Sequence, residues 1–166
     1  MFKSKKRNTI SKIVEENLDY LFRFAFYRIG NREEAEDIVY EAILKLLEKD
    51  AKEIKLESVR FYLFRIVLNL CIDKQRTQDF HRVLIDAIDI EDDTIDIVEK
   101  LEFERIDNYL KNIEPREADI IRMKIIGDLS FVEISKILSI PQSTAKSRFK
   151  SGMIKLRKLF TEKKES

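Results

Sequence analysis

The 166-residue chain contains few of the residues that create sharp turns, with three glycines and two prolines. Valine is scarce relative to isoleucine and leucine, and the alternation of apolar and polar residues that is typical of strands is hard to find. Apolar residues make up 44% of the chain, which is enough for a real core, and they recur at spacings of three and four. These features predict an all-α fold.

Cysteine and histidine are almost missing. Cys71 is the only thiol and cannot form an internal disulfide, which fits a reducing compartment. Because His81 is the only histidine, neither a zinc cluster nor a Cys–His nucleophile pair can be built. The acidic run that starts at Asp89 has Thr94 where a calcium loop requires glycine, and no glycine-rich phosphate loop is present. We therefore expect no catalytic activity, metal, cofactor or small-molecule substrate.

Long apolar runs are missing as well. No stretch approaches the roughly 20 apolar residues of a membrane-spanning helix. The first residues, MFKSKKRNTI, lack the apolar segment of a secretory leader. We therefore expect a soluble, cytoplasmic protein.

Charge is strongly segregated, although 32 basic and 31 acidic residues leave a formal net charge of +1. Residues 33–41 contain five acids and no base, and residues 86–99 contain seven acids and no base. From Gln142 to Thr161 there is no acid, although six lysines and arginines occur there. Such blocks indicate separate surfaces that meet separate partners.

The first half of the chain reads as three helices. Apolar spacing predicts a helix over 10–29, and Gly30 suits the position just after its end. Asn31 and Glu34 form a capping-box pattern that opens a second helix. Its predicted buried stripe is Ala35, Ile38, Val39, Ala42, Ile43, Leu46 and Leu47. After a polar loop at 49–57, a third helix is predicted over 58–76. Residues 8–78 therefore form the first predicted domain.

The second half reads as an acidic linker at 79–97 and a helical domain at 98–162. Pro115 suits the first position of a helix that runs to Gly127. Ser130 with Glu133 forms a capping box for a short helix, and the turn at 139–141 leads into the basic helix. A short helix and a long helix across a three-residue turn predict a helix-turn-helix.

The basic helix is the clearest candidate for a binding site. Hydroxyls and cations in its first two turns suit contact with base edges and phosphates in a DNA major groove. These candidates are Ser143, Thr144, Lys146, Ser147, Arg148 and Lys150. A solvated basic face is the alternative. The residues expected to serve the core are Ala145, Phe149, Ile154, Leu156, Leu159 and Phe160.

Two further faces carry candidate residues. Tyr62, Arg65, Asn69 and Arg76 share one face of the third helix. Aromatics mixed with cations suit single-stranded nucleic acid, although aromatics here are more often core. An acidic face of the second helix carries Glu33, Asp37, Tyr40, Glu41 and Lys45. It suits a basic partner, although a solvated face is the usual explanation.

Three stretches, in order, resemble motifs of one known family. AEDIVYE at 35–41 resembles AEDLVQE, and YLFRIVLNLCID at 62–73 resembles WLYRIARNLAID. LSFVEI at 129–134 with TAKSR at 144–148 resembles LSYEEIAEILGISVGTVKSR. With the helices around them, these matches cover nearly all of the chain outside the linker and tails. The chain therefore resembles bacterial RNA polymerase sigma factors of the extracytoplasmic-function group.

The resemblance implies a promoter-specificity subunit with two helical domains, numbered 2 and 4. Its first motif implies that Glu33, Asp37, Tyr40 and Glu41 dock on the polymerase largest subunit. Its second implies that Tyr62, Arg65, Asn69 and Arg76 act at the −10 promoter element, and its third implies that the basic helix reads the −35 element. It also implies three partners: core RNA polymerase, promoter DNA and an anti-sigma factor. The acidic linker is expected to thread toward the channels of the polymerase.

Some positions depart from the family pattern. Tyr40 replaces the usual glutamine, and Ser135 and Ser139 stand where alanine and glycine are usual. Two other functions remain open on the residues alone. One is a helix-turn-helix regulator that acts without being a polymerase subunit. The other is a helical protein-interaction module whose basic helix contacts an acidic protein.

Overall fold

The computed structural model of the protein describes residues 1–84 and 97–165, and within these ranges all regular structure is helical. The chain forms two compact units, residues 1–97 and 98–166. The predicted all-α fold is confirmed. Most of the predicted linker, and most of the acidic run at 86–99, lies outside the described residues.

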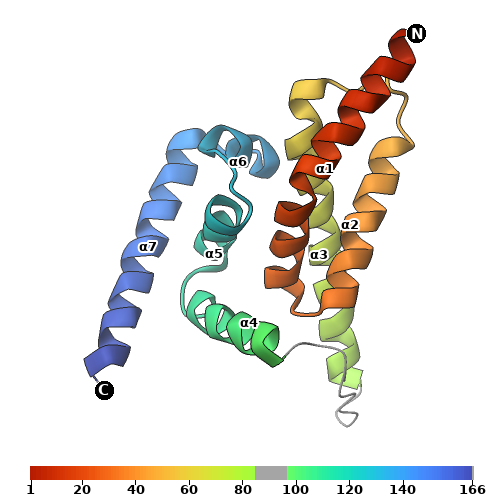
Figure 1. Ribbon diagram of the computed structural model, residues 1–166. Helices are drawn as coiled ribbons and strands as arrows, with labels where there is room; N and C mark the ends of the chain where they lie inside the picture. The colour runs from red at the N-terminus through yellow and green to blue at the C-terminus, as the bar shows by residue number, and fades with distance from the viewer. Residues whose placement is uncertain (85–96, 166) are drawn as a thin grey trace. The chain divides into compact units, whose positions relative to one another are not determined.

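The first unit is a bundle of three long helices, which lie side by side in Figure 1. They are α1 (Phe2–Ile29), α2 (Arg32–Leu47) and α3 (Val59–Leu84), and the 3-10 turn η1 (Leu56–Ser58) precedes α3. Gly30 ends α1 in the left-handed conformation with φ of 80°, as its position predicts. Asn31 then caps α2, because its side chain accepts a hydrogen bond from the Glu34 N–H at 2.9 Å.

The core of the first unit lies where the three helices meet. The rings of Phe24 on α1 and Phe64 on α3 are both buried and pack edge to face with centroids 5.6 Å apart. From α2, the buried residues are Ala35, Ile38, Val39, Ala42 and Leu46. The predicted stripe was wrong at Leu47, which is 53% exposed because it lies at the end of α2.

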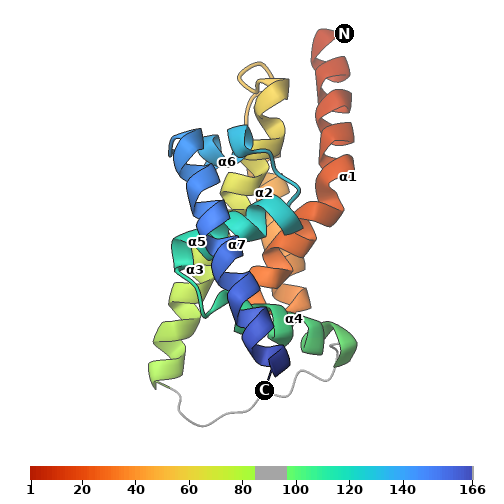
Figure 2. The same cartoon turned by 90° about the vertical axis from the view of Figure 1, so that its left-hand side faces the viewer.

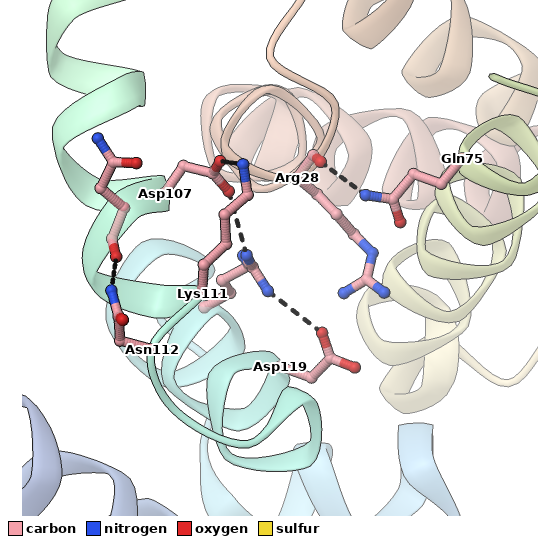
Figure 3. Close-up of polar contacts among 8 residues, drawn as sticks. Arg28, Gln75, Asp107, Lys111, Asn112 and Asp119 are labelled. Carbon is pink, nitrogen blue, oxygen red and sulfur yellow. Dashed lines mark hydrogen bonds and ion pairs between the residues drawn. The ribbon is translucent and has the colours of Figure 1, made fainter. Parts of the chain in front are cut away.

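Helix α3 continues to Leu84, so residues 79–84, which were predicted as linker, are helical. Contacts to the other helices fix the part of α3 that directly precedes this extension. The Gln75 side-chain amide donates to the Arg28 carbonyl oxygen at 2.9 Å, as Figure 3 shows. Lys74 Nζ lies 3.2 Å from the Glu34 carboxylate, which also accepts a hydrogen bond from the Gln78 amide at 2.7 Å. These polar residues therefore fix α3 against the corner between α1 and α2.

The second unit contains α4 (Ile97–Leu110), α5 (Pro115–Ile121), α6 (Phe131–Leu138) and α7 (Gln142–Glu165). A π-helical turn, η2 (Arg122–Ile126), replaces the last part of the single α-helix that was predicted to reach Gly127. Helix α7 packs along α5 and α6, as can be followed in Figure 2. The predicted helix-turn-helix is α6 and α7 with the turn at 139–141.

An apolar cluster and an arginine hold the second unit together. Leu110, Ile113, Ala118 and Ile121 are buried, and Phe149, Met153, Leu156 and Leu159 of α7 pack against them. Arg122 Nη2 lies 3.8 Å from Asp107 of α4, and its Nη1 lies 3.4 Å from Asp119 of α5 (Figure 3). Ile154 and Phe160, which were predicted to serve the core, are 59% and 43% exposed.

Ser139 ends α6 in the left-handed region with φ of 54°, where an L side chain is strained and glycine is not. Replacing Ser139 with glycine should therefore stabilise the second unit by about 0.5–1 kcal/mol. Urea unfolding followed by hydrogen exchange of α6 and α7 peptides would measure this gain. Asp128→Gly is the control, because Asp128 has φ of 51° but aspartate tolerates that region better. If Asp128→Gly stabilises the second unit as much as Ser139→Gly or more, the strain of a serine side chain in the left-handed region does not explain the gain.

Candidate nucleic-acid interface

Local contacts fix the start of α6 and the turn that leads from α6 into α7. Ser130 and Glu133 form the predicted capping box in both directions, with hydrogen bonds of 3.1 and 2.8 Å. Ser135 Oγ donates to the Ile140 carbonyl oxygen at 2.6 Å, so this serine ties α6 to the turn before α7. Ala145 is fully buried, which turns the opposite face of α7 toward solvent.

The first two turns of α7 present free polar groups. Ser143, Lys146, Ser147 and Lys150 are exposed, whereas Thr144 and Arg148 are half-buried. In the described part of the chain, Lys146, Arg148 and Lys150 have no acidic side chain as an ion-pair partner. All six predicted residues are therefore accessible on one stretch of helix, and no carboxylate in residues 1–84 or 97–165 pairs with the three cations among them.

Lys155, one turn further along α7, has a different role. Its Nζ lies 2.9 Å from Oε1 and 3.0 Å from Oε2 of Glu117 on α5, and Ser151 Oγ donates to the same carboxylate at 2.6 Å. Glu117 is only 5% exposed. Burial raises the pKa of the Glu117 carboxyl, but the hydrogen bonds from Ser151 and Lys155 and the charge of Lys155 outweigh it, so the pKa lies below its usual value.

Glu117, Ser151 and Lys155 form a polar cluster around one buried carboxylate, which the sequence did not point to, and the cluster fixes α7 on α5. Gly152 lies beside it, where an added Cβ would approach Ile121 Cδ1 to 2.7 Å. The two helices therefore pack too closely there for a side chain at that position. This cluster therefore fixes the middle of α7, from Ser151 to Lys155, on α5.

The predicted face of α3 lies largely in solvent. Asn69 and Arg76 are exposed, and Tyr62 and Arg65 are half-buried. Lys49 Nζ lies over the Tyr62 ring, 4.2 Å from its centroid. Tyr62 also lines a cavity of about 220 Å³ between α2, the 48–58 segment and the start of α3. Phe64, in contrast, is buried in the core, whereas Tyr62 is half-buried.

The predicted acidic face of α2 is exposed throughout. Glu33, Asp37, Tyr40 and Glu41 all lie in solvent, and Tyr40 is 67% exposed. Glu41 pairs with Lys45 at 3.2 Å. Glu33 and Asp37 have no cationic partner among the described residues. This face therefore offers two uncompensated carboxylates next to an exposed aromatic ring.

A groove of about 470 Å³ runs beside this acidic face, between α1 and α2. Its lining combines apolar and acidic residues: Leu18, Asp19, Phe22, Glu36, Val39, Tyr40 and Ile43. Leu18 and Leu44 are 40% and 48% exposed, so apolar surface continues around the groove. Apolar surface next to uncompensated charge is typical of a protein contact.

The second unit has an apolar groove of its own, of about 530 Å³, between α4, the α5–η2 segment and α7. Ile125 and Phe160 on its edge are 56% and 43% exposed. The sequence predicted Phe160 as core, and its exposure is explained by its position in the lining of this open groove.

Other kinds of site find no support in the described ranges. No group of three or more histidine, cysteine, aspartate or glutamate side chains there is arranged to hold a metal ion. None of the helices in these ranges combines the length and apolar character that crossing a membrane requires.

Two family models match the chain and divide it as the fold does. Residues 13–81 match Sigma-70 region 2, and residues 109–158 match Sigma-70 region 4. Over 92% of this chain and 89% of the relative, the sequence is 27% identical to the ECF RNA polymerase sigma factor SigW of Bacillus subtilis (strain 168). The chain belongs to the extracytoplasmic-function group of RNA polymerase sigma factors. The sigma factor is thus a regulatory polymerase subunit that directs promoter-specific transcription initiation.

Other relatives agree with this assignment. RNA polymerase sigma factor SigV of Bacillus subtilis is 27% identical over 84% of this chain and 82% of its own. The fold resembles CnrH, solved in complex with the cytosolic domain of CnrY, with a TM-score of 0.70, 18% identity and coverage of 92% of this chain and 88% of that one. It also resembles the sigma factor RpoE of Bartonella quintana, solved in complex with the anti-sigma factor NepR, with a TM-score of 0.64, 19% identity and 96% coverage of both chains.

Proposed function

We propose that this sigma factor binds core polymerase through the acidic face of α2 and contacts promoter DNA through α3 and α7. The observation that carries the proposal is the separation of free charge. Glu33 and Asp37 on α2 lack cationic partners among the described residues, and Lys146, Arg148 and Lys150 on α7 lack acidic ones. Uncompensated charges of opposite sign on different helices suit one protein partner and one nucleic-acid partner.

Helix α7 is proposed to read the −35 element. Its first two turns carry the small hydroxyls Ser143, Thr144 and Ser147 beside long cations, which suits entry into a major groove. Arg148 is suited to a bidentate contact with guanine, whereas Lys146 and Lys150 are suited to phosphates. The Ser135–Ile140 hydrogen bond and the Glu117 cluster support the proposal, because they fix the turn before α7 and the middle of α7.

The exposed face of α3 is proposed to hold unpaired bases of the −10 element. The Tyr62 ring borders an open cavity, and a base that stacks on an aromatic ring gains about 1–3 kcal/mol. Arg65, Asn69 and Arg76 follow along the same helical face, where they are placed to contact the strand. Lys49 over the Tyr62 ring adds positive charge at the same place.

Run-off transcription tests the proposed function directly. Purified chain is added to core polymerase with a template whose promoter has been mapped from transcription start sites after overexpression. We expect specific initiation that depends on the added chain. A helix-turn-helix regulator would instead bind an operator without polymerase, and an interaction module would do neither. Failure to direct initiation by core polymerase would overturn the proposal.

Arg148→Ala tests the proposed reading of the −35 element. The variant should lose about 1–3 kcal/mol of binding to duplex −35 DNA if the guanidinium contacts a base. Fluorescence anisotropy with the matched duplex and with single-base variants would measure both affinity and specificity. Lys158→Ala is the control, because Lys158 is exposed on a later turn of the same helix. Equal losses for the two variants would count against a base contact.

We also propose that an anti-sigma factor binds this chain and that this chain acts in the cytoplasm. The solved relative RpoE, in complex with the anti-sigma factor NepR, supports this partner. The apolar groove of the second unit, with Ile125 and Phe160 exposed at its edge, is a candidate surface for it. The proposed cytoplasmic location of the chain follows from its proposed partners, polymerase and promoter DNA.

A further inference from the structure

The first turns of α1 carry positive charge that none of the roles above uses. Residues 1–14 contain five lysines and arginines and no acid. Lys3, Lys5 and Arg7 are exposed, and Lys6 is half-buried. The buried core of the first unit begins only at Ile10, so these residues lie beyond the packed part of the helix.

These cations do not serve the stability of α1. Its first turn contains no acidic residue, and cations near the start of a helix are unfavourable with the helix macrodipole, typically by a few tenths of a kcal/mol each. In this part of the described chain, no ion pair to a carboxylate compensates Lys3, Lys5, Lys6 or Arg7. Positive charge that forms no ion pair and lowers the stability of its own helix is typical of a surface that binds a charged partner.

The fold brings a second lysine-bearing segment to the same end of the first unit, the turn at 48–55, which contains three lysines and three acids and which Figure 1 shows near the start of α1. Lys6 Nζ lies 3.4 Å from the Lys52 carbonyl oxygen. The hydrogen bond from the Lys52 N–H lowers the pKa of Asp50, and the charges of Lys3, Lys52 and Arg7 lower it further. Asp50 therefore offsets part of the positive charge of Lys3, Arg7 and Lys52, and the Lys6–Lys52 contact is what joins the two segments.

The basic surface continues from there to Tyr62. Arg7 and Lys49 line one cavity of about 230 Å³, and Lys49, Lys55 and Tyr62 line the neighbouring cavity of about 220 Å³. Lys49 also lies over the Tyr62 ring. The path from Arg7 through Lys49 to Tyr62 is thus continuous, although Asp50 and Glu53 moderate its charge.

We propose that Lys3, Lys6, Arg7 and Lys52 bind phosphates of the DNA strand whose unpaired bases lie at Tyr62. The inference rests on the proposed function of α3 and extends it to a part of the chain outside the three recognised motifs. Single-stranded nucleic acid is bound by cations that follow the backbone next to aromatic rings on which bases stack. The cations and the ring occur here in that arrangement, on one end of one unit.

A membrane is the rival partner, because Met1 and Phe2 are exposed beside the lysines and anionic lipids also attract cations. Continuity with Tyr62 favours DNA.

The salt dependence of DNA binding tests the proposal. The probe is a fluorescein-labelled promoter fragment that contains an unpaired bubble over the −10 region and lacks the −35 element. Holoenzyme made with Lys3→Gln/Lys6→Gln/Arg7→Gln should bind it on the order of tenfold more weakly near physiological salt. The slope of log K against log salt should fall in magnitude by about 2, because each phosphate contact to a single strand contributes about 0.7. Lys52→Gln alone should lower the magnitude of this slope by about 0.7.

A matched variant, Lys111→Gln/Arg116→Gln/Lys158→Gln, removes the same charge from exposed positions of the second unit and should leave the slope unchanged. Tyr62→Ala separates the two proposals. If Tyr62→Ala weakens binding and the α1 variant keeps the wild-type slope, the inference is wrong and the proposed function stands. If neither variant changes binding, both are wrong. If the α1 variant loses binding to phosphatidylglycerol vesicles but keeps the wild-type slope of log K against log salt for DNA, the inference is overturned in favour of a membrane.

Discussion

Replacing Glu117 with alanine is expected to destabilise the second unit by roughly 2–3 kcal/mol, because charged hydrogen bonds between α5 and α7 are lost. Glu117 is 5% exposed and accepts from both Ser151 and Lys155. The loss is smaller than for a fully buried ion pair, since the Lys155 side chain is 43% exposed and can regain water. Weaker fixation of α7 should also reduce binding to −35 DNA.

Urea-dependent hydrogen exchange of α5 and α7 peptides in the full chain would measure this loss and separate it from the first unit. Glu114→Ala is the control, because Glu114 also faces Lys155 but lies 3.9 Å away with a side chain that is 70% exposed. That change should stay within about 0.5 kcal/mol of wild type. Similar losses for the two variants would show that the buried cluster is not what holds α7.

The contribution of Glu117 to the stability of the second unit should depend on pH. Its pKa is lower in the folded chain than in the unfolded one, so its carboxylate contributes fully above the ordinary glutamate pKa. This contribution is lost as the pH falls below the ordinary value and through the lower folded value. The stability difference between wild type and Glu117→Ala should therefore shrink in that acidic range. A difference that stays constant there would contradict the ionised pair.

Features set by local chemistry could be predicted from the sequence. Gly30 ends α1, Pro115 opens α5, and Ser130 with Glu133 caps α6, because each depends on a residue's own backbone preference or on a partner three positions away. The exposed first turns of α7 and the exposed acidic face of α2 also followed from spacing and charge.

Features set by distant contacts could not be predicted. Helix α3 continues past residue 76 partly because Gln78 contacts Glu34 of α2, 44 positions earlier. Lys155 was interpreted only as part of a basic face, but its partner Glu117 lies 38 positions earlier. Neither pair leaves a periodic signal in the sequence. Phe160 was predicted as core because it is apolar, whereas the groove that exposes it exists only once α4 and α7 have packed.

Replacing Asp37 with arginine is expected to weaken binding to core polymerase by roughly 2 kcal/mol or more, which is at least about thirtyfold in Kd. Asp37 is exposed on the proposed polymerase-binding face and has no cationic partner among the described residues, so the change places a like charge against a basic partner. Because α7 is unchanged, binding of the free chain to −35 duplex should stay the same.

Competition with labelled wild-type chain for core polymerase would measure the loss, and it should grow as ionic strength falls, because repulsion is then less screened. Glu15→Arg is the matched control, since it makes the same charge change at an exposed position of α1 in the same unit. If Asp37→Arg weakens polymerase binding more than Glu15→Arg does, the effect comes from a contact on α2. Equal weakening would mean that the change in net charge alone explains it. If Asp37→Arg competes as well as wild type, α2 does not face polymerase, and its acidic face is only solvated.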